Sequence, residues 1–148
     1  LPDAAAHRAR RQEDDAQADV LQKEALKRAA EQRCDDIATQ RRQAAEALIE
    51  AERRGEDYSL QIWHRNWITG LAATAEHAAG DAAKATDVVE QARRVWQEAR
   101  KKRLVLERLR DRALRRFRHE ETRREQRVID ELARVRFTTR TQAEGSSE

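Results

Sequence analysis

The stretch "RRGEDYSLQIW", residues 53–63, interrupts an otherwise continuous helical pattern and decides the fold. Gly55 suits the C-terminal end of a helix, because glycine adopts the left-handed backbone conformation at low cost. Asp57 or Ser59 can then cap the start of a second helix. No proline lies between this turn and Phe137, so the second helix can run unbroken. We expect a single coiled-coil domain over residues 1–148, with one helix at about 4–54, a turn at about 55–59, a second helix at about 60–137 and a flexible tail at 138–148.

The composition is that of a long helix or coiled coil. The chain has 148 residues, of which 40% are charged and only 4% aromatic, with one proline and four glycines. Its mean hydropathy is -1.04. A sheet protein would need apolar runs at period two between Gly and Pro turns, and a disordered chain would lack regular apolar spacing. The composition therefore predicts an all-α protein.

A heptad stripe runs along the first helix. Its members alternate in steps of three and four, and most are apolar: Ala16, Val20, Lys23, Lys27, Ala30, Cys34, Ile37, Arg41, Ala44, Leu48 and Ala51. Such a stripe forms a seam against a second helix, and the turn makes the pair antiparallel. Because the second helix is the longer one, its part from about Leu109 onward should project beyond its partner.

The sequence "RREQRVIDELARVRF", residues 123–137, places five apolar side chains in this projecting part: Val128, Ile129, Leu132, Val135 and Phe137. Without a partner in the same chain, such a cluster is exposed until another protein covers it. The alternatives are that the N-terminal residues reach far enough to cover it, or that two chains pair there.

Charge is unevenly distributed. Residues 100–136 carry fifteen Lys or Arg against seven Asp or Glu, a local net charge of +8 in a chain of net charge +3. A basic helix of this kind can meet an acidic protein groove or nucleic acid. Cys34 is the only cysteine, and no apolar run approaches the roughly 18 residues of a membrane span. With no visible signal peptide, these features favour a cytoplasmic protein.

No motif for catalysis or cofactor binding is present. The four glycines form neither a GxxxxGK[ST] phosphate loop nor a GxGxxG turn, and the four histidines lack HExxH spacing. Cys34 lies on the seam, where a small buried thiol is far commoner than a nucleophile. A two-helix rod offers no concave pocket for a catalytic triad. We expect no enzymatic activity, no cofactor and no metal site.

Two tryptophans follow the turn, in a chain with few aromatic residues. Trp63, Trp67 and Leu71 are each one helical turn apart. Tryptophan contributes strongly to binding where it is exposed, but it can also close the end of a hairpin as a small core. We expect Trp63 to close the hairpin, whereas Trp67 and Leu71 fit either role.

The stretch "RLRDRALRRFRHEETRREQR", residues 108–127, is a candidate nucleic-acid-binding helix because basic helices can lie along phosphates. Arginine alternates here with Glu and Asp at spacings of three and four, which favours ion pairs on a solvated helix face. We therefore expect no nucleic-acid partner.

"ARRVWQEARKKRLVLERLRDR" followed by "RHEETRREQRVIDELARVRF" resembles the FliJ family, the coiled-coil stalk proteins of flagellar type III protein export. Trp96 matches the tryptophan near the middle of the family's second helix. The specific evidence is the terminal block, whose matching residues are Arg123, Arg124, Glu125, Gln126, Asp130, Glu131, Leu132 and Ala133.

The resemblance implies an antiparallel two-helix coiled coil similar to the central stalk of the rotary F1-type ATPase. It implies a stalk or escort protein that binds the hexameric export ATPase, promotes its assembly and hydrolysis, and links it to export chaperones and the membrane export gate. It places the chain in the cytoplasm, peripheral to the inner membrane through protein contacts. By the resemblance, Trp67 and Leu71 contact the gate. The residues expected to contact the ATPase are Arg123, Arg124, Glu125, Gln126, Val128, Asp130, Glu131, Leu132 and Val135.

Three other functions remain open from the sequence. Injectisome secretion systems possess stalk proteins of similar build. A structural coiled coil that dimerises through its Ala-rich seam would show the same periodicity. A basic nucleic-acid-binding helix would bind duplexes in a salt-sensitive way.

Overall fold

The computed structural model of the chain describes residues 2–145 and consists of two helices. Helix α1 spans Pro2–Arg53, 52 residues, and helix α2 spans Tyr58–Gly145, 88 residues. The described residues contain no strand. This confirms the predicted all-α helical hairpin.

The turn between the helices has the geometry that its sequence predicts. Gly55 has a positive φ of 66°. Its amide donates to the carbonyl of Glu52 at 3.2 Å, and the amide of Glu56 donates to the carbonyl of Ala51 at 3.0 Å. This pair of hydrogen bonds is a Schellman cap, which satisfies carbonyls that the end of α1 would otherwise leave unpaired. Asp57 precedes α2 and its carboxylate accepts the Ser59 hydroxyl at 2.5 Å.

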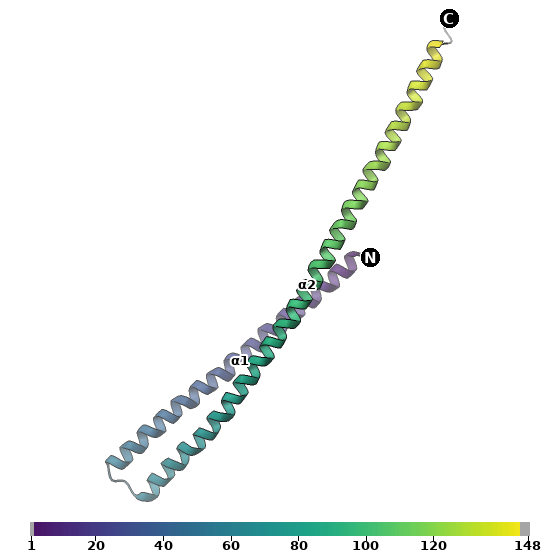
Figure 1. The fold of residues 1–148 in the computed structure, drawn as a ribbon. Coiled ribbons are helices and arrows are strands. Elements are labelled where there is room, and N and C mark those ends of the chain that lie inside the picture. Colours follow the sequence, from purple (N-terminus) through teal and green to yellow (C-terminus); the bar gives the residue numbers. More distant parts are fainter. Residues whose placement is uncertain (1, 146–148) are drawn as a thin grey trace. The chain divides into compact units, whose positions relative to one another are not determined.

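Contacts between residues divide the chain into two units, residues 10–101 and residues 1–9 with 102–148. The expectation of a single domain stays a prediction. Residues 10–101 form the hairpin, with α1 and α2 side by side (Figure 1). Its buried apolar residues are Val20, Ile37, Ala44, Ala51, Leu71, Ala78, Val89 and Ala92. Every member of the predicted seam except Arg41 is buried or half-buried. Alanine supplies half of the buried set, so the two helices can approach closely.

Ion pairs join the two helices of the hairpin at its surface. Arg93 Nη2 lies 2.7 Å from Glu24 Oε1, and Arg65 Nη2 lies 2.9 Å from Glu52 Oε1. The hydrogen bond from Arg93 lowers the pKa of the Glu24 carboxyl below its ordinary value, against a smaller raising effect of desolvation. Exposed pairs of this kind contribute little to stability, but they favour the observed alignment of the helices.

In the other unit, the start of α1 packs against α2 after residue 101. Ala6 and Ala9 are buried, and Arg110 Nε lies 2.6 Å from Asp3 Oδ1. Beyond this contact every residue from Asp111 to Gly145 is exposed. In Figure 1 the purple start of α1 lies beside a green part of α2, and the yellow end of α2 has no helix beside it. The predicted projection of α2 from about Leu109 is therefore confirmed.

The end of α2 differs from the predicted flexible tail. The helix continues through residues 138–145, eight residues past the predicted end, and residues 146–148 lie outside the described part. Neither proline nor glycine occurs between Gly80 and Gly145. The hydroxyls of Thr138 and Thr141 donate to carbonyls one turn earlier, which satisfies these side chains within the helix.

Candidate functional site

Exposed apolar side chains mark the candidate sites. Neither helix, within residues 2–145, is long and apolar enough to cross a membrane. In the same range no three His, Cys, Asp or Glu side chains are arranged to hold a metal ion. Two surfaces stand out, one near the hairpin turn and one in the projecting part of α2.

The surface near the turn, here named the tryptophan surface, consists of Trp63 and Trp67. Their side chains are 58% and 49% exposed. The two rings are stacked, with centroids 6.2 Å apart and planes 5° from parallel, and His64 meets Trp63 edge-on at 5.2 Å. Because they are one turn apart on α2, the rings form one continuous aromatic face. Such a face offers a large apolar area to a partner at small entropic cost.

A groove runs beside the tryptophan surface, between α1 and α2 in the hairpin. It encloses about 460 Å³ and is lined by Gln40, Gln43, Ala44, Ala47, Trp63, His64 and Trp67. The α1 side of this groove was not predicted from the sequence. The sequence feature that could have indicated it is the pair of small residues Ala44 and Ala47. Which α1 residues lie opposite the tryptophans, however, depends on how the two helices are aligned.

Trp63, Trp67 and Leu71, which follow one another at intervals of one helical turn, differ in their exposure. Leu71 is only 5% exposed and belongs to the hairpin core, so its side chain is not available to a partner in this conformation. Trp63 was expected to close the hairpin, but it is the more exposed tryptophan of the pair. Both corrections have the same cause. The covered face of α2 passes through Leu71, and Trp63 lies away from it.

The second surface, the C-terminal stripe, consists of Val128, Leu132 and Val135. Their side chains are 60%, 57% and 53% exposed. At 100° per residue they lie within a sector of about 60° on one face of α2. Ile129 lies beside this face, and Phe137 lies on the opposite one. The five-residue apolar cluster of the sequence is therefore a stripe of three with two outliers.

The polar residues expected to contact the ATPase surround α2 and do not gather on one face. Arg124, Glu125 and Glu131 flank the C-terminal stripe, whereas Arg123, Gln126 and Asp130 lie on the opposite side. Gln126 Nε2 donates to Asp130 Oδ1 at 3.3 Å. Arg134 Nη1 lies 3.5 Å from Glu131 Oε2. Contact with all of these residues requires a partner that encloses the helix.

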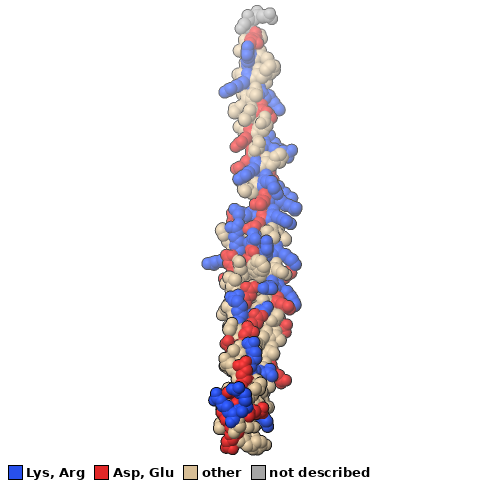
Figure 2. Space-filling model, turned by 90° about the vertical axis from the view of Figure 1, so that its left-hand side faces the viewer, with Lys and Arg blue, Asp and Glu red and all other residues tan. Residues whose placement is uncertain are grey.

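The expected ion pairs within residues 108–127 do not form. In the part of the chain that the structure describes, the one ion pair recorded for this stretch joins Arg110 to Asp3. Figure 2 shows positive and negative side chains interspersed on the visible face. An exposed ion pair is only slightly lower in free energy than two separate hydrated charges, and holding two long side chains together costs conformational entropy. The charges of Arg116, Glu120 and Arg127 are thus available to another molecule.

Trp96 plays a structural part in the hairpin. It is half-buried, and the guanidinium of Arg100 lies 5.6 Å from the centre of its ring. Its Nε1 is buried and has no hydrogen-bond partner among the described residues. The ring therefore contributes packing and a cation–π contact.

Comparison with known proteins gives one family. The family described as "Flagellar FliJ protein" matches residues 6–142. This range contains both surfaces and the hairpin turn, and it confirms the resemblance found in the sequence. No curated protein and no solved structure matches the chain.

Proposed function

Because the chain belongs to the FliJ family of flagellar proteins, we propose that it is the stalk of the flagellar export ATPase. Members of this family serve flagellar protein export as structural and escort proteins rather than as enzymes. In our proposal the chain binds the hexameric ATPase, promotes its assembly and hydrolysis, and links it to the membrane export gate and to export chaperones. It acts in the cytoplasm, held near the inner membrane by protein contacts. The family match favours the flagellum over the injectisome.

The observation that carries this proposal is the uncovered part of α2. From Asp111 to Gly145 every residue is exposed, over a helix of about 50 Å. One face is apolar and the others are charged, so a ring of subunits could contact the helix from every side. A rod that binds only the assembled ring stabilises that ring by mass action.

The direct test is the hydrolysis rate and oligomeric state of the type III export ATPase of the same genome, with and without an equal concentration of this protein. We expect faster hydrolysis and more hexamer when the protein is present. An unchanged rate and unchanged hexamer content, with the protein helical, would exclude the stalk function.

The tryptophan surface supports a second contact, with the membrane export gate. Replacing Trp63 and Trp67 together by Ala should weaken binding to the gate at least about tenfold, because two exposed aromatic faces are removed. Stimulation of the ATPase should not change, since the C-terminal stripe is untouched. The measurement is a parallel titration of the variant against each partner.

The variant Leu71→Ala distinguishes the loss of a binding contact from the loss of structural support for the hairpin. Since Leu71 is buried, its truncation should lower the thermal unfolding midpoint, whereas the tryptophan variant should unfold like the native protein. Equal loss of gate and ATPase binding in the tryptophan variant would argue against two separate surfaces.

A further inference from the structure

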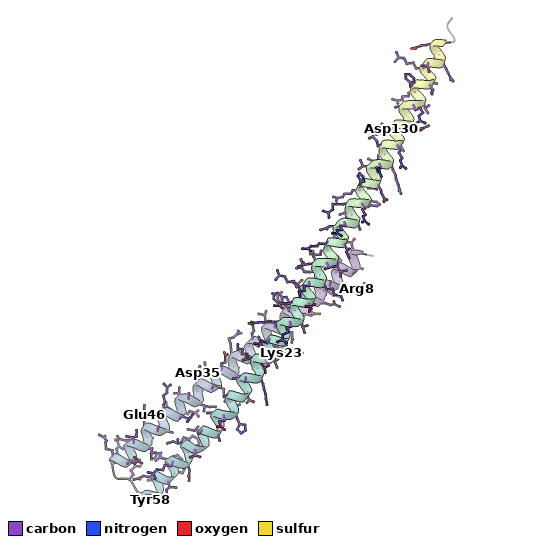
Figure 3. All side chains as sticks on the ribbon, in the orientation of Figure 1. Arg8, Lys23, Asp35, Glu46, Tyr58 and Asp130 are labelled. Carbon is purple, nitrogen blue, oxygen red and sulfur yellow. The ribbon has the colours of Figure 1, made fainter. Side chains whose placement is uncertain are left out.

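The face that carries the C-terminal stripe also extends toward the start of α1. Leu114 and Phe117 lie in the same sector as the stripe, at the point where α1 begins to cover α2. Together these five residues form the extended stripe, a continuation of the face that α1 covers. Figure 3 shows a single helix around Asp130, with no second helix beside it. The side chains of the extended stripe are between 42% and 60% exposed.

Charged side chains flank the extended stripe on both sides. On one flank, at 100° per residue, lie Arg116, Glu120, Arg124, Arg127 and Glu131. Their charges are positive, negative, positive, positive and negative along the helix. On the other flank Asp111 lies near the start and Arg136 near the end of the extended stripe, with Arg118 and Glu125 between them. Among the described residues, Glu131 alone of these nine has an ion-pair partner, Arg134 at 3.5 Å.

We propose that the extended stripe is an interface between two copies of this chain, paired antiparallel about a point between Arg123 and Arg124. A two-fold axis perpendicular to both helices brings like flanks together. In this register Arg116 meets Glu131 of a second copy, and Glu120 meets Arg127 of the second copy. On the other flank Asp111 meets Arg136 of the second copy. Each of these three pairs occurs twice and joins opposite charges, whereas Arg124 faces Arg124 of the second copy across the axis.

The apolar side chains interdigitate in the same register. Leu114 falls between Leu132 and Val135 of the second copy, and Phe117 falls between Val128 and Leu132 of the second copy. Next to Leu114 and Phe117 the single chain already has a groove of about 240 Å³, which is lined by Asp3, Arg110, Ala113, Leu114 and Phe117. It lies where Val135 of the second copy approaches, so the start of α1, at Asp3, contributes one wall of the interface.

A parallel arrangement does not fit this face. It would place Glu121, in the middle of the extended stripe, against Glu121 of the second copy. The antiparallel register separates the two glutamates and places each near Arg124 of the other chain. A polar layer of this kind fixes register and orientation in coiled coils, at some cost in stability.

In the antiparallel pair, the end of α2 can bend away from the first residues of α1 of the second copy, which avoids a steric clash. In the antiparallel register, residues 138–145 approach that segment. This part of α2 has no large apolar side chain. Its threonine hydroxyls bond to carbonyls of the preceding turn, a pattern that bends helices easily.

Pairing would cover Val128, Leu132 and Val135, the stripe that our proposed function assigns to the ATPase. The paired and the ATPase-bound states would then exclude each other, and the free protein would keep its apolar face covered. This consequence rests on the proposed function, but the pairing itself does not.

The test uses two charge variants of the full-length chain and contains no ATPase. The first, Glu120→Arg with Glu131→Arg, makes positions 116, 120, 127 and 131 all basic, and the second, Arg116→Glu with Arg127→Glu, makes the same four positions all acidic. Analytical ultracentrifugation over a range of concentrations measures self-association of each variant, of their equimolar mixture and of the native chain. Circular dichroism verifies that each variant is as helical as the native protein.

We expect the native chain to form dimers, and each variant alone to self-associate at least about tenfold more weakly, because four attractive pairs become repulsive. The mixture should regain dimers, since the four pairs among positions 116, 120, 127 and 131 again join opposite charges in the mixed dimer. A native chain that stays monomeric up to millimolar concentration would overturn the proposal. So would variants that associate like the native chain, or a mixture that stays monomeric.

Discussion

Replacing Val128, Leu132 and Val135 together by Ala should abolish stimulation of the export ATPase and leave the helix content nearly unchanged. The three truncations remove seven carbon atoms from side chains that are more than half exposed in the free protein. If about half of that apolar surface is buried in the complex, the loss is roughly 3 kcal/mol, more than about a hundredfold in affinity. Alanine favours helix, so the projecting part of α2 should stay folded.

The matched control truncates three exposed apolar residues of the hairpin, Leu21, Leu26 and Ile49, to Ala. Their exposed fractions, 59%, 56% and 65%, are close to those of the C-terminal stripe. The control removes a similar apolar area far along the chain from the stripe and should leave stimulation intact. Full stimulation by the stripe variant, with the steady-state hydrolysis rate as readout, would show that the stripe does not carry ATPase binding.

Ala78→Leu should lower the stability of the hairpin. Ala78 is 1% exposed, and the seam around it is built largely from alanine. A leucine there has no room unless the helices separate, and overpacking of this kind costs about 1–3 kcal/mol. For a chain of this size the thermal midpoint should fall by roughly 3–10 °C. Thermal melts followed by circular dichroism measure the change.

Ala79→Leu provides the control one residue away. Ala79 is exposed, and leucine favours helix almost as much as alanine does, so the midpoint should move by no more than about 2 °C. Because the two variants have the same composition, any difference between them reports the closeness of the helices at residue 78. Equal melting behaviour would mean that the hairpin is not closely packed at this point.

The alignment of the two helices explains why Trp67 is exposed and Leu71 is buried, although both were expected to contact the gate. Trp67 and Leu71 are one turn apart and carry similar sequence signals. Four residues at 100° each amount to one full turn plus about 40° around α2. This difference is enough to move a side chain from an exposed position to the covered face. Trp63 was misassigned for the same reason. From the sequence alone the seam of α2 is poorly defined near the turn, since few large apolar residues mark it there.

The sequence by itself determined the helices, the turn and the projecting end. Helix formation depends on hydrogen bonds between residues four apart, and a left-handed cap needs a glycine at one position. Residues that are close in sequence therefore determine both features. The heptad spacing predicted the α1 seam almost completely, because periodicity is also local. The tertiary structure decided which face of α2 is covered, how far α1 reaches along α2 to Arg110, and therefore which apolar side chains stay exposed. These features depend on contacts between residues far apart in the chain, and local sequence carries little information about how distant segments align.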